Sequence, residues 1–222
     1  MPVTNPFCPM EIRPELRFPQ LFNCLSDEPE WMKLLLDCGK PYDPLLHELI
    51  RQGERTYEEI EALPKGYNTA KRISERLGLK PGLVNKWIYK IAEDLISLND
   101  ARPNLFYTEG EIPCGIQGSF YGTWFHWSMS LPVLPRTGDS FDFRLANLVI
   151  DISSFTVGGV TFIRDAGKTY IQINLEPGHG GLYKTLQRQR ARLLGLTDYR
   201  NTSYLKEEEI LLELAAGKRY IK

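Results

Sequence analysis

The chain has 222 residues, of which 42% are hydrophobic and 25% are charged, and its formal net charge at pH 7 is −1. This length is ample for a packed core, and we expect two small domains. No run of 18 apolar residues occurs, and the first residues lack the basic and apolar regions of a secretion signal, so we expect a cytoplasmic protein that does not contact a membrane. The cysteines are scattered without metal-ligand spacing, which predicts reduced thiols and no cofactor: Cys8, Cys24, Cys38 and Cys114.

The N-terminal third of the chain predicts an extended segment followed by helices. Residues 1–29 are rich in Pro and Phe, which favours an extended N-terminal segment. Residues 30–37 and 43–51 have apolar residues at helical spacing, with Asp43 as the expected N-cap before Pro44. Thr56 is the expected N-cap of a third helix at residues 57–63. A helical domain at residues 30–99 follows from these elements and the helix pair described next.

Residues 69–91 (TAKRISERLGLKPGLVNKWIYKI) carry the most informative pattern in the chain. Gly78 separates two apolar runs, and a glycine there can take a positive φ and end a helix. Pro81 suits the first turn of the second helix, and Ser74 is small enough to let the two helices approach closely. The apolar runs have helical spacing and comprise Ile73, Leu77, Val84, Trp87, Ile88 and Ile91. The pattern therefore predicts two helices joined by a tight turn.

This segment resembles the helix-turn-helix superfamily of DNA-binding domains, in which a small residue precedes the turn glycine by four positions and an aliphatic residue follows it by six. Ser74, Gly78 and Val84 occupy those positions. Ser74 replaces the usual alanine, and Lys80 replaces the usual Ser or Thr cap. The resemblance covers about a tenth of the chain. It implies a recognition helix within residues 81–98 and makes residues 57–63 the first of three helices.

The resemblance implies which side chains meet DNA. Asn85 would pair with adenine, Lys86 would donate to guanine, and Leu83 would touch a thymine methyl group. Lys71, Arg72, Arg76 and Lys90 would meet phosphates. The alternative for each charged residue is an ordinary solvated position on a helix. The full predicted DNA-binding set is Lys71, Arg72, Arg76, Lys80, Gly82, Leu83, Asn85, Lys86, Tyr89 and Lys90.

Charge is concentrated in this part of the chain. Residues 65–91 contain seven basic residues and only Glu75 as an acid, which gives the segment a net charge of +6 in a chain whose total is −1. A local cationic region on an otherwise acidic protein attracts phosphate without promoting indiscriminate adhesion. The charge distribution therefore favours a nucleic-acid partner.

A β-rich domain is predicted at residues 100–222. The turn-rich sequence NDARPN at residues 99–104 is followed by period-two patterns that predict strands at residues 121–131, 148–157, 160–165 and 169–175. Gly158-Gly159 and Ala166-Gly167 are the expected hairpin turns. Asp139 is expected to bond backbone amides within a turn, and a ligand contact by Arg136 and Asp139 is the alternative. Together these strands predict a small antiparallel β-meander or barrel.

Aromatic residues and leucines suggest further contacts in this domain. No Lys or Arg occurs between residues 103 and 135, which favours core packing of the aromatic cluster over stacking on bases. Phe120 and Trp124 fall on the opposite face and are candidates to dock the helical domain, a partner chain or a ligand. Residues 182–194 and 206–216 predict C-terminal helices, whose leucine stripes favour a dimer. The cluster comprises Phe106, Tyr107, Phe120, Tyr121, Trp124, Phe125 and Trp127.

The sequence predicts an α+β protein that binds double-stranded DNA, with a homodimer as the expected assembly and a ligand or protein on the β domain left open. The role that fits is a transcriptional regulator or a DNA-binding component of a mobile element. A protein-interaction adaptor, using the helix pair and the aromatic β domain without catalysis, is the alternative. An enzyme is less favoured because no nucleotide-binding or hydrolase motif occurs. No catalytic signature links His47, His126 and His179 with Asp139, Asp142 and Asp151.

Overall fold

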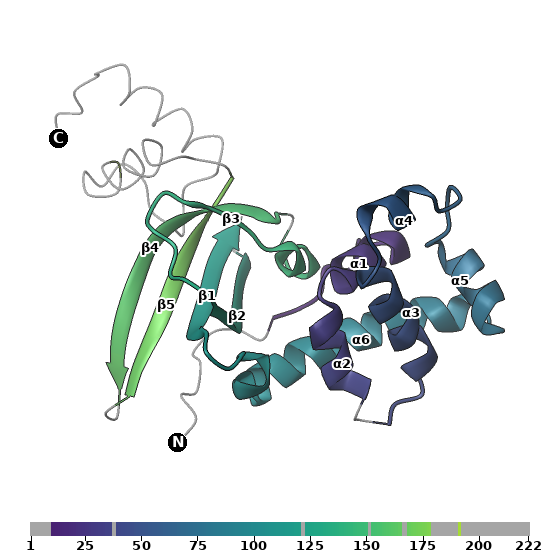
Figure 1. The fold of residues 1–222 in the computed structure, drawn as a ribbon, viewed down its shortest axis with the longest axis horizontal. Helices are drawn as coiled ribbons and strands as arrows, with labels where there is room; N and C mark the ends of the chain where they lie inside the picture. The colour runs from purple at the N-terminus through teal and green to yellow at the C-terminus, as the bar shows by residue number, and fades with distance from the viewer. Residues whose placement is uncertain are drawn as a thin grey trace, which may run out of the picture. The chain divides into compact units, whose positions relative to one another are not determined.

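The computed structural model describes residues 10–36, 39–120, 123–150, 152–165 and 168–178, together with Ala191. Helices come first in the chain and a five-stranded sheet follows, so the fold is α+β as predicted (Figure 1). These residues form two compact units. The helical unit contains the described residues up to Tyr107 and also the segment Arg144–Val149, and the rest belongs to the β unit.

The helical unit is built around its longest helix. Its elements are α1 (Phe18–Ser26), α2 (Pro29–Leu36), α3 (Asp43–Gly53), α4 (Tyr57–Glu61), α5 (Ala70–Leu77), α6 (Pro81–Ala101) and the short 3-10 helices η1 (Pro103–Phe106) and η2 (Arg144–Leu148). Helix α6 packs against α1, α2, α3 and α5. Five of its apolar residues are fully buried at the spacing of one helical face: Val84, Ile88, Ile91, Ala92 and Leu95.

The first helix and the C-terminal limit of this unit differ from the sequence-based expectations. Residues 18–26, expected to be extended, form α1, because Pro19 lies in the first turn, where proline is tolerated, and Leu21, Phe22 and Leu25 are fully buried. The unit extends to Tyr107 and not only to residue 99, since η1 continues from α6 and the ring of Phe106 meets that of Trp31 edge-on at 5.5 Å.

The N-cap of α3 differs from the expected residue, whereas the N-cap of α4 is the expected one. Tyr42, and not the expected Asp43, is the N-cap of α3. Thr56 caps α4 as predicted, with Thr56 Oγ1 accepting from the Glu59 amide at 3.3 Å and Glu59 Oε2 accepting from the Thr56 amide at 2.8 Å. However, α4 has five residues and none is buried. Helix α4 is therefore not packed as the first of three helices would be. The helices that pack on α6, besides α5, are α1, α2 and α3.

The β unit contains one curled sheet. Its strands are β1 (Ile112–Phe120), β2 (Thr123–Leu131), β3 (Ser140–Asp142), β4 (Ser154–Asp165) and β5 (Lys168–Pro177), in the order β2-β1-β5-β4-β3 (Figure 1). All neighbouring pairs are antiparallel except β1 and β5, which are parallel. Two aromatic residues of the predicted cluster pack in the core of the sheet: Phe125 and Trp127 are buried, and the Phe125 ring lies 5.4 Å from that of Phe155. Phe106 instead belongs to the helical unit, and Trp124 is 38% exposed.

Gly158-Gly159, the hairpin turn expected between the strands at residues 148–157 and 160–165, does not form a turn. Residues 154–165 are one continuous strand, and Gly158-Gly159 is the site of a bulge where the register shifts between Val157 and Gly159. The strand expected at residues 148–157 begins only at Ser154, and Leu148 is instead the last residue of η2. The Ala166-Gly167 turn, Tyr121 and the two expected C-terminal helices lie outside the described residues, apart from Ala191.

Candidate nucleic-acid interface

The joint between α5 and α6 has the geometry that its glycine dictates. Gly78 has φ 66° and ψ 28°, and its amide donates to the Glu75 carbonyl while the Leu79 amide donates to the Ser74 carbonyl at 2.9 Å. These two bonds satisfy carbonyls that the end of α5 leaves free, and only glycine adopts this backbone at little cost. Ile73, Ser74 and Val84 are buried where the helices meet. The turn is thereby fixed at Gly78-Leu79-Lys80, and Pro81 begins α6.

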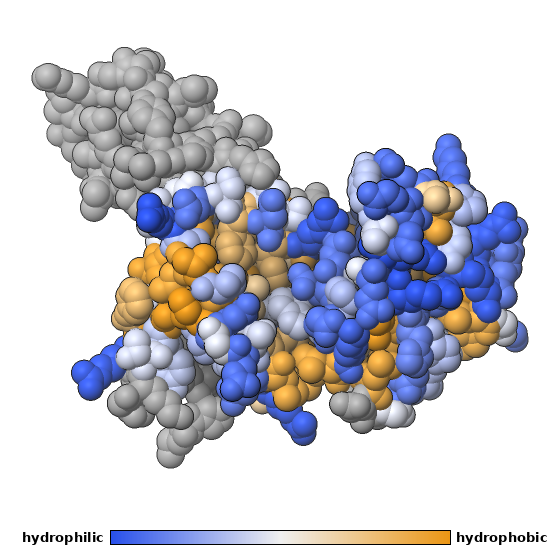
Figure 2. Space-filling model, viewed as in Figure 1, coloured by the Kyte–Doolittle hydropathy of each residue, from blue (hydrophilic) through white to orange (hydrophobic). Residues whose placement is uncertain are grey.

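The first two turns of α6 present a polar surface. Gly82, Leu83, Asn85 and Lys86 are exposed, as is Lys80 at the N-cap, whereas Val84 between them is fully buried. Lys71 on α5 is exposed as well. Figure 2 shows hydrophilic residues over α4 and α5 in this part of the helical unit. The structure therefore brings together the predicted base-contacting residues of α6 on one accessible end of the helix.

The basic residues of the segment divide into two groups. In the first group, the basic side chain forms an ion pair with a carboxylate: Arg72 pairs with Glu75 at 3.2 Å, and Lys90 pairs with Asp94 at 2.8 Å. The hydrogen bond to Asp94 raises the pKa of Lys90. In the second, no carboxylate among the described residues lies within ion-pair distance: Lys65, Lys71, Lys80 and Lys86. The second group is the one whose positive charge is not offset locally.

Arg76 belongs to a structural cluster rather than to this surface. Its guanidinium lies 3.9 Å from the centre of the Tyr67 ring, donates to the Tyr67 carbonyl at 2.9 Å, and approaches Glu48 Oε2 at 3.4 Å. Arg55 donates to the Tyr67 hydroxyl at 3.1 Å, which lowers the pKa of that phenol. Glu48 is buried on α3 and also accepts from Arg51 at 2.5 Å. The cluster ties α5 and the loop before it to α3.

Tyr89 is also partly occupied elsewhere. Its hydroxyl donates to the backbone carbonyl of Leu16, so the N-terminal segment lies against α6 at this level. Met10, Ile12 and Pro14 line a shallow cavity with Tyr89 and Lys90 on the same side of the helix. The exposed polar surface therefore ends before Tyr89 and includes only the N-terminal part of α6. This is also the part of a recognition helix that usually contacts bases.

Other candidate residues have structural partners. Asp139 Oδ2 accepts from the Arg136 amide at 2.7 Å, as the turn interpretation predicted. Asp142 accepts from the Ser154 hydroxyl at 2.7 Å. Burial raises the pKa of Cys24 and Cys114 to about 11, so both thiols stay protonated near neutral pH. Cys8, Cys38, Asp151 and His179 lie outside the described residues.

No family model, curated protein or solved structure matches this chain. Among the described residues, no helix combines the length and apolar character that crossing a bilayer requires.

Proposed function

We propose that the α5–α6 pair binds double-stranded DNA and that the first two turns of α6 enter the major groove. The observation that carries this proposal is the group of exposed cations around the start of α6, with Lys71, Lys80 and Lys86 lacking a carboxylate partner among the described residues. Cations without a carboxylate partner release counterions when they bind phosphate, and they do not have to give up an ion pair to do so.

Base reading falls to two side chains on the exposed end of α6. Asn85 is exposed, and its amide can both donate and accept, which suits the N6 and N7 edge of adenine. Lys86 is its neighbour and donates to guanine O6 or N7. Leu83, 36% exposed, offers an apolar contact to a thymine methyl group. Lys71 and Lys80 then anchor the backbone, and Gly82 lets the DNA approach α6 closely.

Two helical turns cover few base pairs, so specific binding requires a second copy of the chain on a neighbouring half-site. We therefore propose a dimeric regulator of transcription or a DNA-binding component of a mobile element, acting in the cytoplasm. Compared with the full sequence-predicted set, the contact surface is narrower: Arg72, Arg76 and Lys90 are held in ion pairs and Tyr89 in a bond to Leu16.

The test is a selection from a random duplex library, followed by polarisation titrations of the full chain at two salt concentrations. We expect Asn85→Ala and Lys86→Ala to weaken binding to the preferred duplex by about 1–3 kcal/mol, and to relax preference at one position. Lys71→Ala should weaken binding to all duplexes alike and reduce the salt slope by about one.

Lys33→Ala is the matched control, because it removes the same charge from α2, where Lys33 pairs with Glu30 at 2.6 Å and Glu54 at 2.9 Å. It should leave DNA affinity unchanged. Binding that does not depend on salt, or an equal loss for Lys33→Ala and Lys86→Ala, would contradict the proposal.

A protein-interaction adaptor is the second candidate, and one observation favours it. Phe162, Ile163 and Tyr170 on the β4–β5 hairpin are 64%, 41% and 44% exposed. Figure 2 shows apolar residues gathered over this part of the sheet. Ile163 and Tyr170 are direct partners across the two strands, and Phe162 points to the opposite face of the hairpin. Exposed apolar side chains on neighbouring strands are typical of a surface that meets another protein. The adaptor would be favoured if the chain does not bind DNA and if Phe162→Ser abolishes its binding to another protein.

A further inference from the structure

One edge of the sheet is open over the second half of β4. The strand order places β3 beside β4, but β3 has only three residues and pairs with Ser154–Thr156. The backbone bonds on this side end at Val157, whose amide donates to the Asp139 carbonyl at 2.9 Å and whose carbonyl accepts from the Gly138 amide at 2.7 Å. Among the described residues, the backbone of residues 159–165 hydrogen-bonds only to β5. The other side of this stretch therefore has unpaired backbone groups in the described part of the chain.

Three residues direct their backbone groups toward this open edge. In an antiparallel pair of strands, every second residue points its N–H and C=O away from the neighbouring strand. Asp165 and Lys168 are paired and are separated by two residues, so they bond each other as the closing pair of the hairpin. Counting back from Asp165 leaves Val160, Phe162 and Arg164 pointing outward. Each offers one donor and one acceptor, which is the arrangement that an added strand would pair with.

This stretch of β4 lacks most of the features that keep sheet edges from pairing. Natural edges are protected by proline, lysine, bulges or a covering segment. Residues 160–164 (VTFIR) contain no proline or lysine, and their one charged residue, Arg164, stands at the end. The bulge at Gly158-Gly159 lies before them. Phe162, at the centre, is 64% exposed. An apolar strand with an open backbone edge predicts pairing with another strand.

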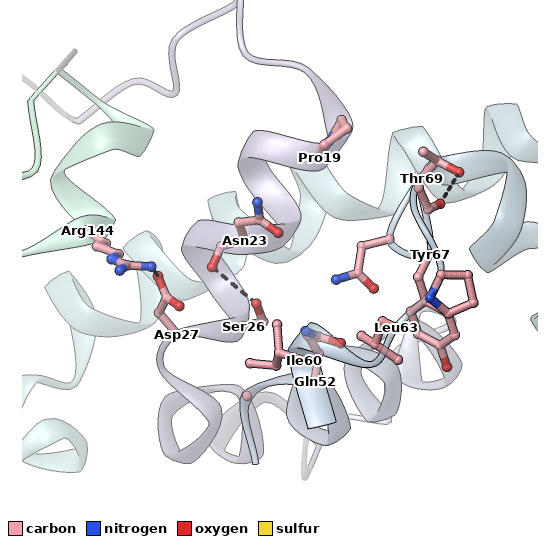
Figure 3. A pocket seen from close by; sticks show the side chains of 14 residues that line it. Pro19, Asn23, Ser26, Asp27, Gln52, Ile60, Leu63, Tyr67, Thr69 and Arg144 are labelled. Carbon is pink, nitrogen blue, oxygen red and sulfur yellow. Dashed lines mark hydrogen bonds and ion pairs between the residues drawn. The ribbon is translucent and has the colours of Figure 1, made fainter. Parts of the chain in front are cut away.

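The hollow between α1, the end of α3 and the α4–α5 loop presents a different situation. Several of its polar groups bond within the protein: the Ser26 hydroxyl donates to the Asn23 carbonyl at 3.1 Å, and Arg144 pairs with Asp27 at 2.8 Å (Figure 3). The β4 edge, by contrast, offers a regular row of donors and acceptors, so it defines the geometry of its partner.

The same strand of a second copy fits this edge. Two copies related by a twofold axis perpendicular to the sheet pair antiparallel, and an axis at Phe162 gives every residue from 160 to 164 a partner. Phe162 then faces Phe162 of the second copy, and Val160 faces Arg164 of the second copy. The two Arg164 side chains lie at opposite ends of the paired strands, so like charges are not opposed. The edge is therefore complementary to itself in both hydrogen bonding and charge.

We propose that β4 pairs edge to edge with β4 of a second copy through residues 160–164 and joins the two sheets into one. The pairing forms about six backbone hydrogen bonds and covers both Phe162 rings. So short an interface is smaller than a standard one, and we expect a Kd of about 10–100 μM. It supplies the second copy that the function proposed for α6 requires. Only this role in DNA binding rests on the proposed function, because the open edge is a property of the sheet.

Sedimentation equilibrium of the full chain without DNA tests the interface. The unaltered chain should be mostly monomeric at about 1 μM and mostly dimeric at about 1 mM. Phe162→Lys and Phe162→Glu should each raise the Kd at least about tenfold, because the axis places two like charges opposite each other. An equimolar mixture of these two variants should form a heterodimer, since residue 162 faces itself across the axis.

Val133→Lys is the matched control for the loss of an exposed apolar side chain and the gain of a charge. Val133 is 70% exposed on the connection between β2 and β3, away from the paired stretch of β4. This variant should dimerise with an unchanged Kd. Because the side chain of Phe162 is mostly exposed, Phe162→Lys should keep the circular dichroism spectrum and the urea midpoint of the unaltered chain.

Cysteine substitution tests the register of the two strands. Under mild oxidation, Phe162→Cys should form a disulfide between copies, because paired Cα atoms lie about 5.5 Å apart, within the range of a disulfide. Tyr170→Cys is the control. Tyr170 lies on β5, so its two copies would be separated by three strand spacings, at least about 14 Å, which is too far to cross-link. The unaltered chain gives the background from its own cysteines.

The proposal is overturned if the unaltered chain stays monomeric at about 1 mM. It is also overturned if Phe162→Lys dimerises as the unaltered chain does, if the mixture of Lys and Glu variants stays monomeric, or if Tyr170→Cys cross-links as readily as Phe162→Cys. DNA is absent from all these measurements. A monomeric chain that binds DNA would therefore overturn the interface alone, and a dimer that does not bind DNA would overturn only the function proposed for α6.

Discussion

Replacing Gly78 by alanine isolates the backbone conformation of the α5–α6 turn. A Cβ built on Gly78 meets no atom within 4 Å, so the change introduces no clash. The backbone has φ 66°, where an alanine costs about 1–2 kcal/mol. Alanine also restricts the unfolded chain, which recovers about 0.4–1 kcal/mol. We therefore expect Gly78→Ala to lower the free energy of unfolding by about 1 kcal/mol, and Gly78→Asn to lower it by less, because Asn tolerates this region.

Urea unfolding of the full chain, followed by circular dichroism at a helical wavelength, measures this difference for the helical unit. Gly82→Ala is the matched control. Gly82 lies in the first turn of α6, does not have a positive φ, and has open space around its Cβ position, so alanine there should raise the midpoint slightly. If Gly78→Ala raised the midpoint as Gly82→Ala does, the turn residue would not be left-handed in solution, and the geometry on which the α6 surface depends would be wrong.

Two further predictions concern packing and pH. In β1, a Cβ on Gly118 would lie 2.6 Å from Cε1 of Phe125. Gly118→Ala should therefore destabilise the β unit by about 1–3 kcal/mol, measured by urea unfolding followed by tryptophan fluorescence. Gly115→Ala is the control and should not destabilise the unit, because a Cβ on Gly115 meets no atom within 4 Å. Burial, with Asp27 nearby, raises the pKa of Glu28 from 4.5 to about 7, so the folded chain binds the proton more tightly than the unfolded chain. The stability that this proton contributes is present below pH 4.5 and is lost as the pH rises through 7. Glu28→Gln should therefore have nearly the same urea midpoint as the unaltered chain at pH 4 and be more stable than it by roughly 2 kcal/mol at pH 8. Equal midpoints of the two chains at pH 8 would contradict this.

Features set by neighbouring residues could be predicted from the sequence. The helices α2, α3, α5 and α6, the cap at Thr56 and the left-handed Gly78 follow from apolar spacing, a hydroxyl at a helix start and a glycine after an apolar run. The turn at Asp139 is of the same kind, because the bond to the Arg136 amide spans three residues. Local signals failed at Phe18–Ser26, where buried contacts outweighed a Pro-rich composition.

For the proposed interface, the sequence indicated which residues are cationic but not which of them are available. Arg76 looks like Lys71 in a sequence pattern, yet it is held by Glu48, which is 28 positions away in the chain. Tyr67 and Arg55, which complete that cluster, carry no signal in the sequence that links them to α5. The bond from Tyr89 to Leu16 likewise joins residues 73 positions apart.

The sequence by itself determined the local conformations: where helices begin, where the chain turns at Gly78, and where positive charge is concentrated. Only the tertiary structure decided that β1 pairs in parallel with β5, that Gly158-Gly159 bulges within one strand instead of turning, and that Lys80 and Lys86 at the start of α6 are exposed without a carboxylate partner among the described residues. The physical reason is the separation along the chain over which each kind of interaction acts. Backbone preferences and helical periodicity act over a few residues, whereas strand pairing, burial and charge compensation depend on which distant segments meet in the folded chain.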